Sequence, residues 1–475
     1  MQGHHEYQPE LFSAVDVELL IPKGHLLRRI DRVLDLSFLP ELTSSLYAKA
    51  NGRPSIDPEV FVRMILLQAI YNIDSDRQLC EEVGFNLAYR WFSRLSLRDP
   101  VPDHSSITRI RDRFGETTYR KIFTAVVCQC AEAGLVKGER VMADGSMIAA
   151  NASLYAMVER AEKIEETPSG SLGVQQEPSK DGLSIKDLRK NSIVGKKITN
   201  QTHFCKTDPD ATLAGKSGEY KALRHKTHDI IDAGSRVILD CHVTTGTVSE
   251  HKVFPDRLMV VQNEFNLSVG EVIADRGYGA GDVLEFLEER GIGSNIPLWS
   301  TRVGAAFEKE EGFIYDRKQN AMTCPKGITM KRTKMDQDSN LFVLSKVVCE
   351  KCPPYQTCVT EVERRNGRGK RVRIHRRQHL FQAVLAKETK PEFVTKLRER
   401  MWKMEGIFAE AKSHHGMRRA RYRGRTKVQM QVYVVATVQN LKRLAASIFD
   451  DLCSVLRILI FGAQTPKKIL KVRFS

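Results

Sequence analysis

Apolar residues recur at helical spacing in the first part of the chain. Residues 55–73 read SIDPEVFVRMILLQAIYNI, with Asp57 placed to cap a helix, Pro58 in its first turn and a broad apolar face. Residues 75–95 predict a short helix, a turn at Gly84 and a second helix, which is helix-turn-helix-like spacing. The pattern indicates a helical N-terminal region.

A further helix is predicted in the segment DHSSITRIRDRFG, residues 103–115, with its start at Ser105 or Ser106. Arg109 and Arg111 recur along this helix. Two interpretations stay open at this point. The segment belongs either to a small helical bundle with a solvated basic face or to a surface that binds DNA.

Strand-like patterns begin further along the chain. Residues 139–153, ERVMADGSMIAANAS, and residues 271–282, EVIADRGYGAGD, each predict an apolar strand that ends at an aspartate. Residues 228–254 predict a hairpin with Gly234 in its turn. Residues 156–200 are polar and rich in glycine, serine and proline, which is typical of a linker or insertion. Strands followed by further helices predict an α/β fold.

The two strand-ending carboxylates are Asp144 and Asp275. A desolvated carboxylate is costly unless it is paired or bound to a metal, although a turn or cap aspartate is common at a strand end. Neighbouring strands bring such carboxylates into one site, where their repulsion favours a divalent cation. Mg²⁺ prefers oxygen ligands, and two ions about 4 Å apart can cleave a phosphodiester.

A third acid is expected on the long helix predicted at 390–416, which ends at Gly416. Glu405 shares one helical stripe with Arg398 and Lys412, and Phe408 beside it can anchor the helix. We expect Glu405 to face metal-bound DNA phosphate. The alternative is an ordinary surface glutamate with a helical ion pair. The other glutamates of the helix, Glu399 and Glu410, are expected to face solvent or form ion pairs.

The formal net charge of +16 indicates a polyanionic partner, nucleic acid first and an anionic membrane surface second. Residues 364–377 hold eight lysines or arginines and no acid, and residues 412–427 hold seven and no acid. These blocks predict phosphate contacts and salt-sensitive binding. A membrane partner is disfavoured because no segment with a dominant apolar face accompanies them. No secretory signal or membrane span is apparent, so we expect a cytoplasmic, nucleoid-associated protein.

Ten cysteines in 475 residues are too few for a disulfide scaffold. Four of them have the spacing C-x24-C-x2-C-x5-C, and the tight CEKC pair suits one end of a tetrahedral zinc site. The alternative is four unconnected thiols. The candidate ligands of a structural Zn²⁺ are Cys324, Cys349, Cys352 and Cys358.

The ordered set of motifs resembles one family over nearly the whole chain. PDHSSITRIRDRFG, VMADGSMIAANAS, VIADRGYGAGD, EGIFAEAKSHHGMRRARYRG and VQNLKRL follow one another as in the DDE transposases of bacterial insertion sequences. The resemblance implies a ribonuclease-H-like mixed sheet flanked by helices, with an all-α N-terminal domain and a cysteine-containing insertion. It also implies Asp144, Asp275 and Glu405 as the catalytic acids, holding two Mg²⁺ or Mn²⁺ ions.

Such transposases bind the terminal inverted repeats of their element, hydrolyse a strand and join the exposed 3′-OH to target DNA. Related enzymes carry a tyrosine and an arginine seven and four positions before the glutamate, where this chain has Arg398 and Met401. Lys412 matches the family's lysine, and Arg398 or Arg400 can replace the missing contacts. The residues expected to bind double-stranded DNA are Arg109, Arg111, Arg276, Arg398, Arg400, Lys412, Arg418, Arg419, Arg421 and Arg423.

The expected domains follow from the motifs and the resemblance. They are a helical DNA-binding domain at 1–133, a catalytic domain at 134–299 and 391–449, a basic cysteine-containing insertion at 300–390, and a tail at 450–475. A homodimer is expected because two element ends must be held together. Two alternatives stay open: a DDE-type nuclease without strand transfer, and an inactive or domesticated transposase that only binds DNA.

Overall fold

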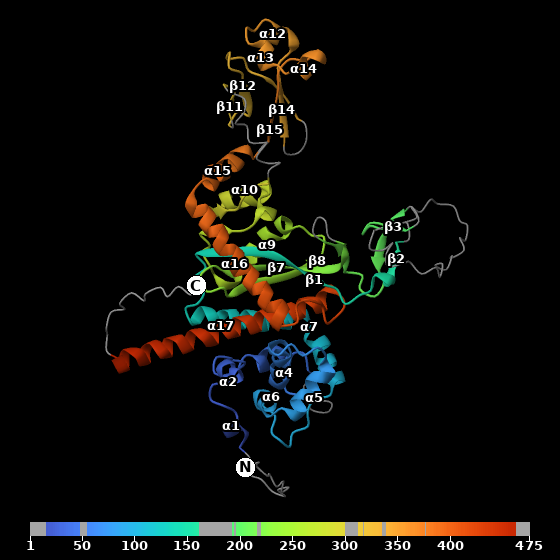
Figure 1. The fold of residues 1–475 in the computed structure, drawn as a ribbon, viewed down its shortest axis with the longest axis vertical. Coiled ribbons are helices and arrows are strands. Elements are labelled where there is room, and N and C mark those ends of the chain that lie inside the picture. The colour runs from blue at the N-terminus through green and yellow to red at the C-terminus, as the bar shows by residue number, and fades with distance from the viewer. Residues whose placement is uncertain are drawn as a thin grey trace, which may run out of the picture. The chain divides into compact units, whose positions relative to one another are not determined.

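The structure is a computed structural model (Figure 1). It describes residues 16–47, 55–160, 192–193, 196–215, 220–299, 312–316, 318–334, 339–375 and 377–461. Most of the linker predicted at 156–200 lies outside these residues. The described chain forms two compact units. The first takes its residues from Met1–Lys137, Gly145–Val248 and Glu405–Ser475, and the second from Gly138–Asp144 and Ser249–Met404.

The N-terminal helices belong to the first unit. The cap predicted at Asp57 for the helix in residues 55–73 is confirmed, because the Asp57 carboxylate accepts a hydrogen bond from the Glu59 amide at 2.7 Å. The prediction of a turn at Gly84 is wrong. Helix α5 continues through Gly84 to Phe85, and Asn86 caps helix α6. The helices are α1 (Val17–Leu20), α2 (Leu26–Asp31), α3 (Leu39–Ser44), α4 (Pro58–Ile70), α5 (Asp76–Phe85), α6 (Leu87–Phe92) and α7 (His104–Glu132).

Helix α7 begins slightly earlier than predicted, because Asp103 rather than a serine caps it. It packs against the long helix α17 (Arg425–Phe461), which also contacts α4 and strand β8 (Ile238–Thr245) (Figure 1). The N-terminal helices therefore share their core with α17.

The central sheet has the strand order of a ribonuclease-H-like fold, which confirms the predicted fold class. The hydrogen-bonded order is β8, β7 (Ala222–Asp232), β1 (Arg140–Ala149), β9 (Glu271–Ile273) and β10 (Gly293–Asn295). Strands β1, β9 and β10 are parallel, whereas β7 and β8 form the predicted antiparallel hairpin around Gly234. Strand β6 (Thr212–Ala214) pairs with the start of β7.

Helices of the second unit surround β9 and β10. They are α9 (Glu250–Phe265), the short helix η2 (Arg276–Tyr278), α10 (Gly281–Glu289), α15 (Gln378–Glu388) and the first part of α16 (Pro391–His414). The predicted long helix is confirmed as α16, which ends just before Gly416 with its φ of +72°. Residues 391–404 of this continuous helix belong to the second unit and residues 405–414 to the first.

A small module within the second unit carries the four clustered cysteines. Its core contains buried residues such as Met322, Phe342 and Ile374. It is built from β11 (Ile314–Asp316), β12 (Ala321–Thr323), β13 (Lys331–Lys334), β14 (Ser339–Val343), α12 (Lys346–Glu350), α13 (Tyr355–Cys358), α14 (Glu361–Arg365) and β15 (Arg371–His375). Strands β13, β14 and β15 form one antiparallel sheet.

Short pieces complete the first unit. They are η1 (Leu154–Ala156), β2 (Met157–Glu159), β3 (Ser192–Ile193), β4 (Lys196–Lys197) and β5 (His203–Cys205). Strand β2 pairs with β5, and β3 pairs with β4. A small apolar cluster that includes Met157, Cys205 and Leu223 joins the β2–β5 ribbon to β7.

Candidate active site

The register of two parallel strands brings Asp144 and Asp275 together. Met142 of β1 lies opposite Ile273 of β9. Each aspartate follows two residues later, so the same register carries both carboxylates to the carboxyl end of β9. Parallel strands deliver groups to one edge of a sheet in this way. The pairing that the sequence predicted for these two acids is therefore found in the second unit.

The prediction that a strand ends at Asp144 is wrong. Strand β1 runs on to Ala149, so Asp144 is its fifth residue rather than its last. The strand continues because Ser146 and Ile148 beyond the aspartate are still buried. Strand β9 does end before Asp275, as predicted. Asp144 and Asp275 thus lie just past the end of β9, where the longer strand β1 continues.

Arg400 lies against both carboxylates. Its Nη2 atom is 2.8 Å from Asp144 Oδ2 and 3.8 Å from Asp275 Oδ2. The guanidinium also donates to the Ala143 carbonyl, with Nε and Nη2 each at 3.3 Å. The Arg400 side chain is 10% exposed, Asp144 21% and Asp275 47%. Two carboxylates share one guanidinium, so this trio, which we call the acid centre, carries one excess negative charge.

The turn after Asp275 is fixed by local hydrogen bonding and close packing. Asp275 Oδ1 accepts a hydrogen bond from the Gly277 amide at 2.8 Å and so caps η2. A Cβ atom at Gly279 would lie 2.6 Å from the Pro297 carbonyl oxygen, which only glycine avoids. The glycines of EVIADRGYGAGD therefore shape the loop that holds the carboxylate.

Tyr278 packs locally within the second unit. Its ring is 2% exposed and meets the Phe254 ring edge-on, with centroids 5.3 Å apart. Burial first, and then the negative charges of Asp144 and Glu250, raise the pKa of the Tyr278 phenol well above its ordinary value. The hydroxyl therefore stays protonated beneath the acid centre. Arg276, in contrast, is exposed.

Glu405 is exposed on α16. It follows Arg400 by five residues, which corresponds to about 7.5 Å along the helix axis and about 140° around it. Among the described residues, no hydrogen bond or ion pair involves the Glu405 side chain. Its assignment as the third acid stays a prediction.

Glu399 and Glu410 of α16 form ion pairs, as predicted. Glu399 Oε1 pairs with Lys403 Nζ at 2.5 Å. Glu410 pairs with Lys442 at 2.5 Å and with Arg443 at 3.2 Å. Burial alone would raise the pKa of Glu410, but its hydrogen bond with His415 and the charges of Arg443 and Lys442 outweigh it, so the pKa is well below its ordinary value.

The expected DNA-binding residues differ in exposure. Arg109, Arg276, Arg398, Arg418, Arg419 and Arg423 are exposed, whereas Lys412 and Arg421 are partly buried. Arg111 is buried, and its guanidinium lies at 2.7 and 2.8 Å from the two Asp76 carboxylate oxygens and over the Tyr422 ring. An arginine held this way has no donor face left for DNA, so Arg111 leaves the predicted set.

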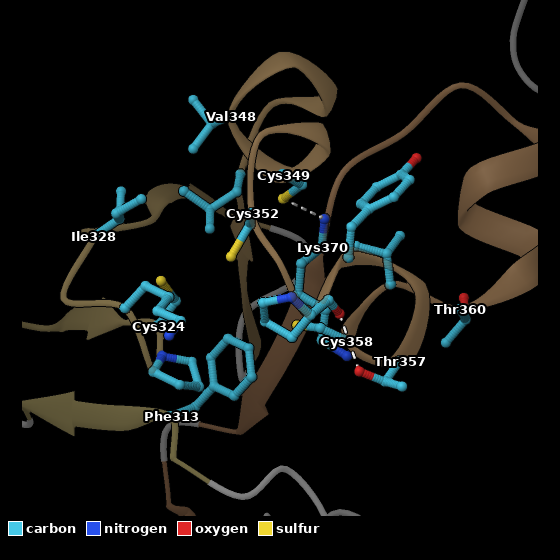
Figure 2. A pocket seen from close by; sticks show the side chains of 16 residues that line it. Phe313, Cys324, Ile328, Val348, Cys349, Cys352, Thr357, Cys358, Thr360 and Lys370 are labelled. Carbon is cyan, nitrogen blue, oxygen red and sulfur yellow. Dashed lines mark hydrogen bonds between the residues drawn. The ribbon is translucent and has the colours of Figure 1, made fainter.

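Arg400 is the residue whose contacts the sequence did not reveal. It was expected at a DNA phosphate, yet the structure places it on Asp144 and Asp275. No local signal marks this contact, because its partners lie far away in the sequence. The cysteines Cys324, Cys349, Cys352 and Cys358 do come together, around one cavity of the small module (Figure 2).

Two family models match the chain. One, described as a transposase domain (DUF772), matches residues 15–113, and the other, described as a transposase DDE domain, matches residues 323–445. The second match includes Glu405 but begins after Asp275.

Two solved structures resemble this chain with low sequence identity and low TM-scores. The piggyBac transposase synaptic complex with hairpin DNA has 11% identity and a TM-score of 0.29, covering 90% of this chain and 78% of that chain. The Mos1 transposase paired-end complex with the left transposon end has 10% identity and a TM-score of 0.15, covering 58% and 69%. TM-scores this low do not establish a shared fold, so the assignment rests on the family models.

A ribonuclease-H-like sheet that brings two carboxylates together beside its parallel strands suits metal-dependent phosphoryl transfer. The two family models take the identification further: they support an insertion-sequence DDE transposase, an enzyme that cleaves and joins DNA with divalent metal ions. Within the part of the chain that the structure describes, no helix has the length and apolar character needed to cross a membrane.

Proposed function

We propose that this transposase binds the terminal inverted repeats of its element, hydrolyses a DNA strand there and joins the 3′-OH to target DNA. Asp144, Asp275 and Glu405 are the proposed catalytic acids, and two Mg²⁺ ions, or Mn²⁺ in their place, are the proposed cofactors. The observation that carries this proposal is the pairing of Asp144 with Asp275 around a single guanidinium.

The residues of the acid centre fit a divalent cation. The donors are carboxylate oxygens, which are the ligands that Mg²⁺ prefers. The trio has an excess negative charge, and Asp275 is half exposed, so water and a phosphate oxygen have access to it.

Bound divalent ions would activate water and then the 3′-hydroxyl and would stabilise the leaving oxygen. The chain's own residues prepare the site for this chemistry. Arg400 offsets one of the two carboxylate charges, and its guanidinium donates both to Asp144 and to the Ala143 carbonyl. Tyr278, three residues after Asp275, is buried against Phe254 and so anchors the turn that carries Asp275.

DNA contacts are proposed for the exposed cations on either side of the third acid. Arg398 on α16 and the run Arg418, Arg419 and Arg423 are exposed and rich in donors for phosphate oxygens. Arg276 beside Asp275 is a further phosphate contact. Because these residues meet backbone phosphates, they supply affinity and register rather than base specificity.

The helical region at 1–133 is proposed to take part in DNA binding, with Arg109 as an exposed contact. Two element ends must be cut and joined together, so we propose that two copies of the chain act in one complex. The catalytic domain is proposed to comprise residues 134–299 and 391–449, with the small cysteine module inserted between them.

The test is cleavage of a labelled duplex that carries the terminal repeat and its flanking DNA, in Mg²⁺ or Mn²⁺. The comparison is between the wild type, Glu405→Ala and Glu399→Gln. The last variant is the matched control, because Glu399 lies on the same helix but is already paired with Lys403. We expect nicking at the repeat end by the wild type and the control, and binding without nicking by Glu405→Ala.

Other outcomes separate the alternatives. Nicking without joined products would indicate a nuclease that lacks strand transfer. Binding without cleavage by the wild type in both metals would indicate an inactive transposase that acts as a DNA-binding protein. Nicking that persists in Glu405→Ala would exclude Glu405 as the third acid.

A further inference from the structure

Four cysteines from separate parts of the small module surround one cavity. Its volume is about 830 Å³, and its lining includes Cys324, Cys349, Cys352 and Cys358 (Figure 2). Cys324 follows β12, Cys349 lies in α12, Cys352 follows that helix, and Cys358 ends α13. None of the four is in a disulfide. Thiols that converge from three segments suit a single soft cation.

The turn after Cys324 has the hydrogen bonds of a tight metal-binding loop. The Gly327 amide donates to the Cys324 carbonyl at 2.8 Å, and the Cys324 amide donates to the Ile328 carbonyl at 3.0 Å. Gly327 has a φ of +76°, the left-handed conformation that glycine adopts without strain. The turn holds Cys324 at the rim of the cavity in Figure 2.

A second turn joins Cys349 to Cys352. The Cys352 amide donates to the Cys349 carbonyl at 3.0 Å, which closes this turn, and both cysteines line the cavity. The Lys370 amide donates to Cys349 Sγ at 3.4 Å. This contact fixes the position of the Cys349 sulfur at the cavity wall.

The charge around the cavity favours an anionic cluster. Zn²⁺ with four thiolates carries two excess negative charges. The described lining residues contain no aspartate or glutamate, but they do include Lys326 and Lys370. Lys370 is only 6% exposed, and its ammonium lies 5.6 Å from the centre of the Phe313 ring. Two lysines without a lining acid match the charge of a tetrathiolate zinc centre.

The size of the module gives a reason for such a centre. Residues 312–375 have one small core, in which Cys324 and Cys349 are themselves members. A core of this size supplies little stability without a metal or another cross-link. Among the described residues, no three of these side chains are placed so that they could hold a metal ion as the structure stands. Metal binding would pull the four thiols inward across the cavity.

We propose that Cys324, Cys349, Cys352 and Cys358 bind one structural Zn²⁺ that ties the β11–β12 hairpin to helices α12 and α13. Four thiolates leave no open coordination position, so this ion takes no part in cleavage. The site is separate from the Mg²⁺ site proposed at Asp144 and Asp275, and it stands whether or not those acids are catalytic.

The test is the zinc content of the full-length protein after dialysis against a weak chelator, measured by plasma mass spectrometry. We expect about one zinc per chain. Cys349→Ser combined with Cys352→Ser should lose nearly all of it. Cys128→Ser is the matched control, because Cys128 lies on α7 outside the module, and it should keep the wild-type content. Asp144→Asn should also keep its zinc, which separates this site from the active site.

A second measurement does not depend on the double variant folding. Wild-type protein produced with cobalt should show the charge-transfer and visible bands of tetrahedral thiolate coordination. Cys358→His, which keeps a zinc-binding side chain, should retain the metal that Cys358→Ser loses. The proposal would be overturned by purified wild type with far less than one zinc per chain, by disulfides joining these cysteines, or by a cobalt spectrum without thiolate ligation.

Discussion

Two sites to which helix α16 contributes a residue differ in their balance of carboxylates and cations. At the acid centre, Asp144 and Asp275 share the guanidinium of Arg400. At the second site, which we call the Glu410 cluster, one carboxylate meets both Lys442 and Arg443. The acid centre has more acids than cations, and the Glu410 cluster has more cations than acids.

The difference indicates which site is built for an added cation. Excess negative charge in a half-exposed site is relieved by Mg²⁺, whereas a carboxylate already surrounded by cations has nothing to gain from it. The Glu410 cluster therefore has a structural role, in which α16 is fastened to α17. The charges of the partner side chains therefore separate the roles of the two sites.

The largest expected effect is at the acid centre. Asp144→Asn keeps the shape of the side chain but removes a charged metal ligand. Strand cleavage should fall by about 10³-fold, because a bound divalent ion supplies several kcal/mol to phosphoryl transfer. The cleavage rate of Glu410→Gln should stay within about threefold of the wild-type rate, because Glu410 is not a proposed metal ligand. Single-turnover cleavage of the element-end duplex measures the rates of both variants. Equal losses of rate would contradict the distinction between the acid centre and the Glu410 cluster.

Arg400→Ala tests whether the guanidinium holds the place of a cation. Without metal, the variant leaves two carboxylates unneutralised and should lose about 3 kcal/mol of unfolding free energy. Mg²⁺ should restore a large part of this loss, because it neutralises the same carboxylates. Guanidinium chloride unfolding in EDTA and in Mg²⁺ gives the two values. A loss that is identical in both conditions would show that Arg400 and the metal do not share the site.

Glu410→Gln tests the structural site through its pH dependence. The folded pKa of Glu410 is lowered, so its ion pairs contribute stability that is fully present above the unfolded pKa of about 4.3. That contribution is lost as the pH falls through the folded pKa. The wild type should exceed the variant by roughly 2 kcal/mol near pH 7, and the gap should shrink in acid. A gap that stays constant from neutral to acidic pH would contradict this account.

Arg418→Gln combined with Arg419→Gln should separate binding from chemistry. Both side chains are exposed, so we assign them to DNA phosphates. The salt dependence of binding should weaken by about two in the slope of log K against log salt. Cleavage at saturating DNA should be unchanged, which is the opposite pattern to Asp144→Asn. Fluorescence anisotropy over a salt series measures the slope, and an unchanged slope would remove these residues from the interface.

Local signals were enough to predict much of the fold. The cap at Asp57, the hairpin at Gly234 and the helix that ends before Gly416 each depend on neighbouring residues alone. Asp275 was also predictable, because its strand ends where the apolar run ends. The ribonuclease-H-like order followed from the family resemblance rather than from periodicity.

Contacts between distant segments could not be predicted. Strand β1 continues past Asp144, and nothing near Asp144 indicates how far its neighbour β9 extends. Arg111 was read as an exposed cation on a basic helix, but its partners Asp76 and Tyr422 lie elsewhere in the chain. The contact of Arg400 with Asp144 and Asp275 was likewise unpredictable, because these aspartates lie far from it in the sequence. Sequence periodicity reports which face of an element is apolar, not what that face will meet.

The most direct test of the account is Mn²⁺ binding to the transposase with a short element-end duplex, followed by electron paramagnetic resonance. The account predicts bound Mn²⁺ in the wild type and in Glu410→Gln. It predicts that Asp144→Asn combined with Asp275→Asn weakens binding at least about tenfold, since two charged ligands are lost. Wild-type affinity in the double variant would contradict the account, because the metal would then be bound by residues other than this pair.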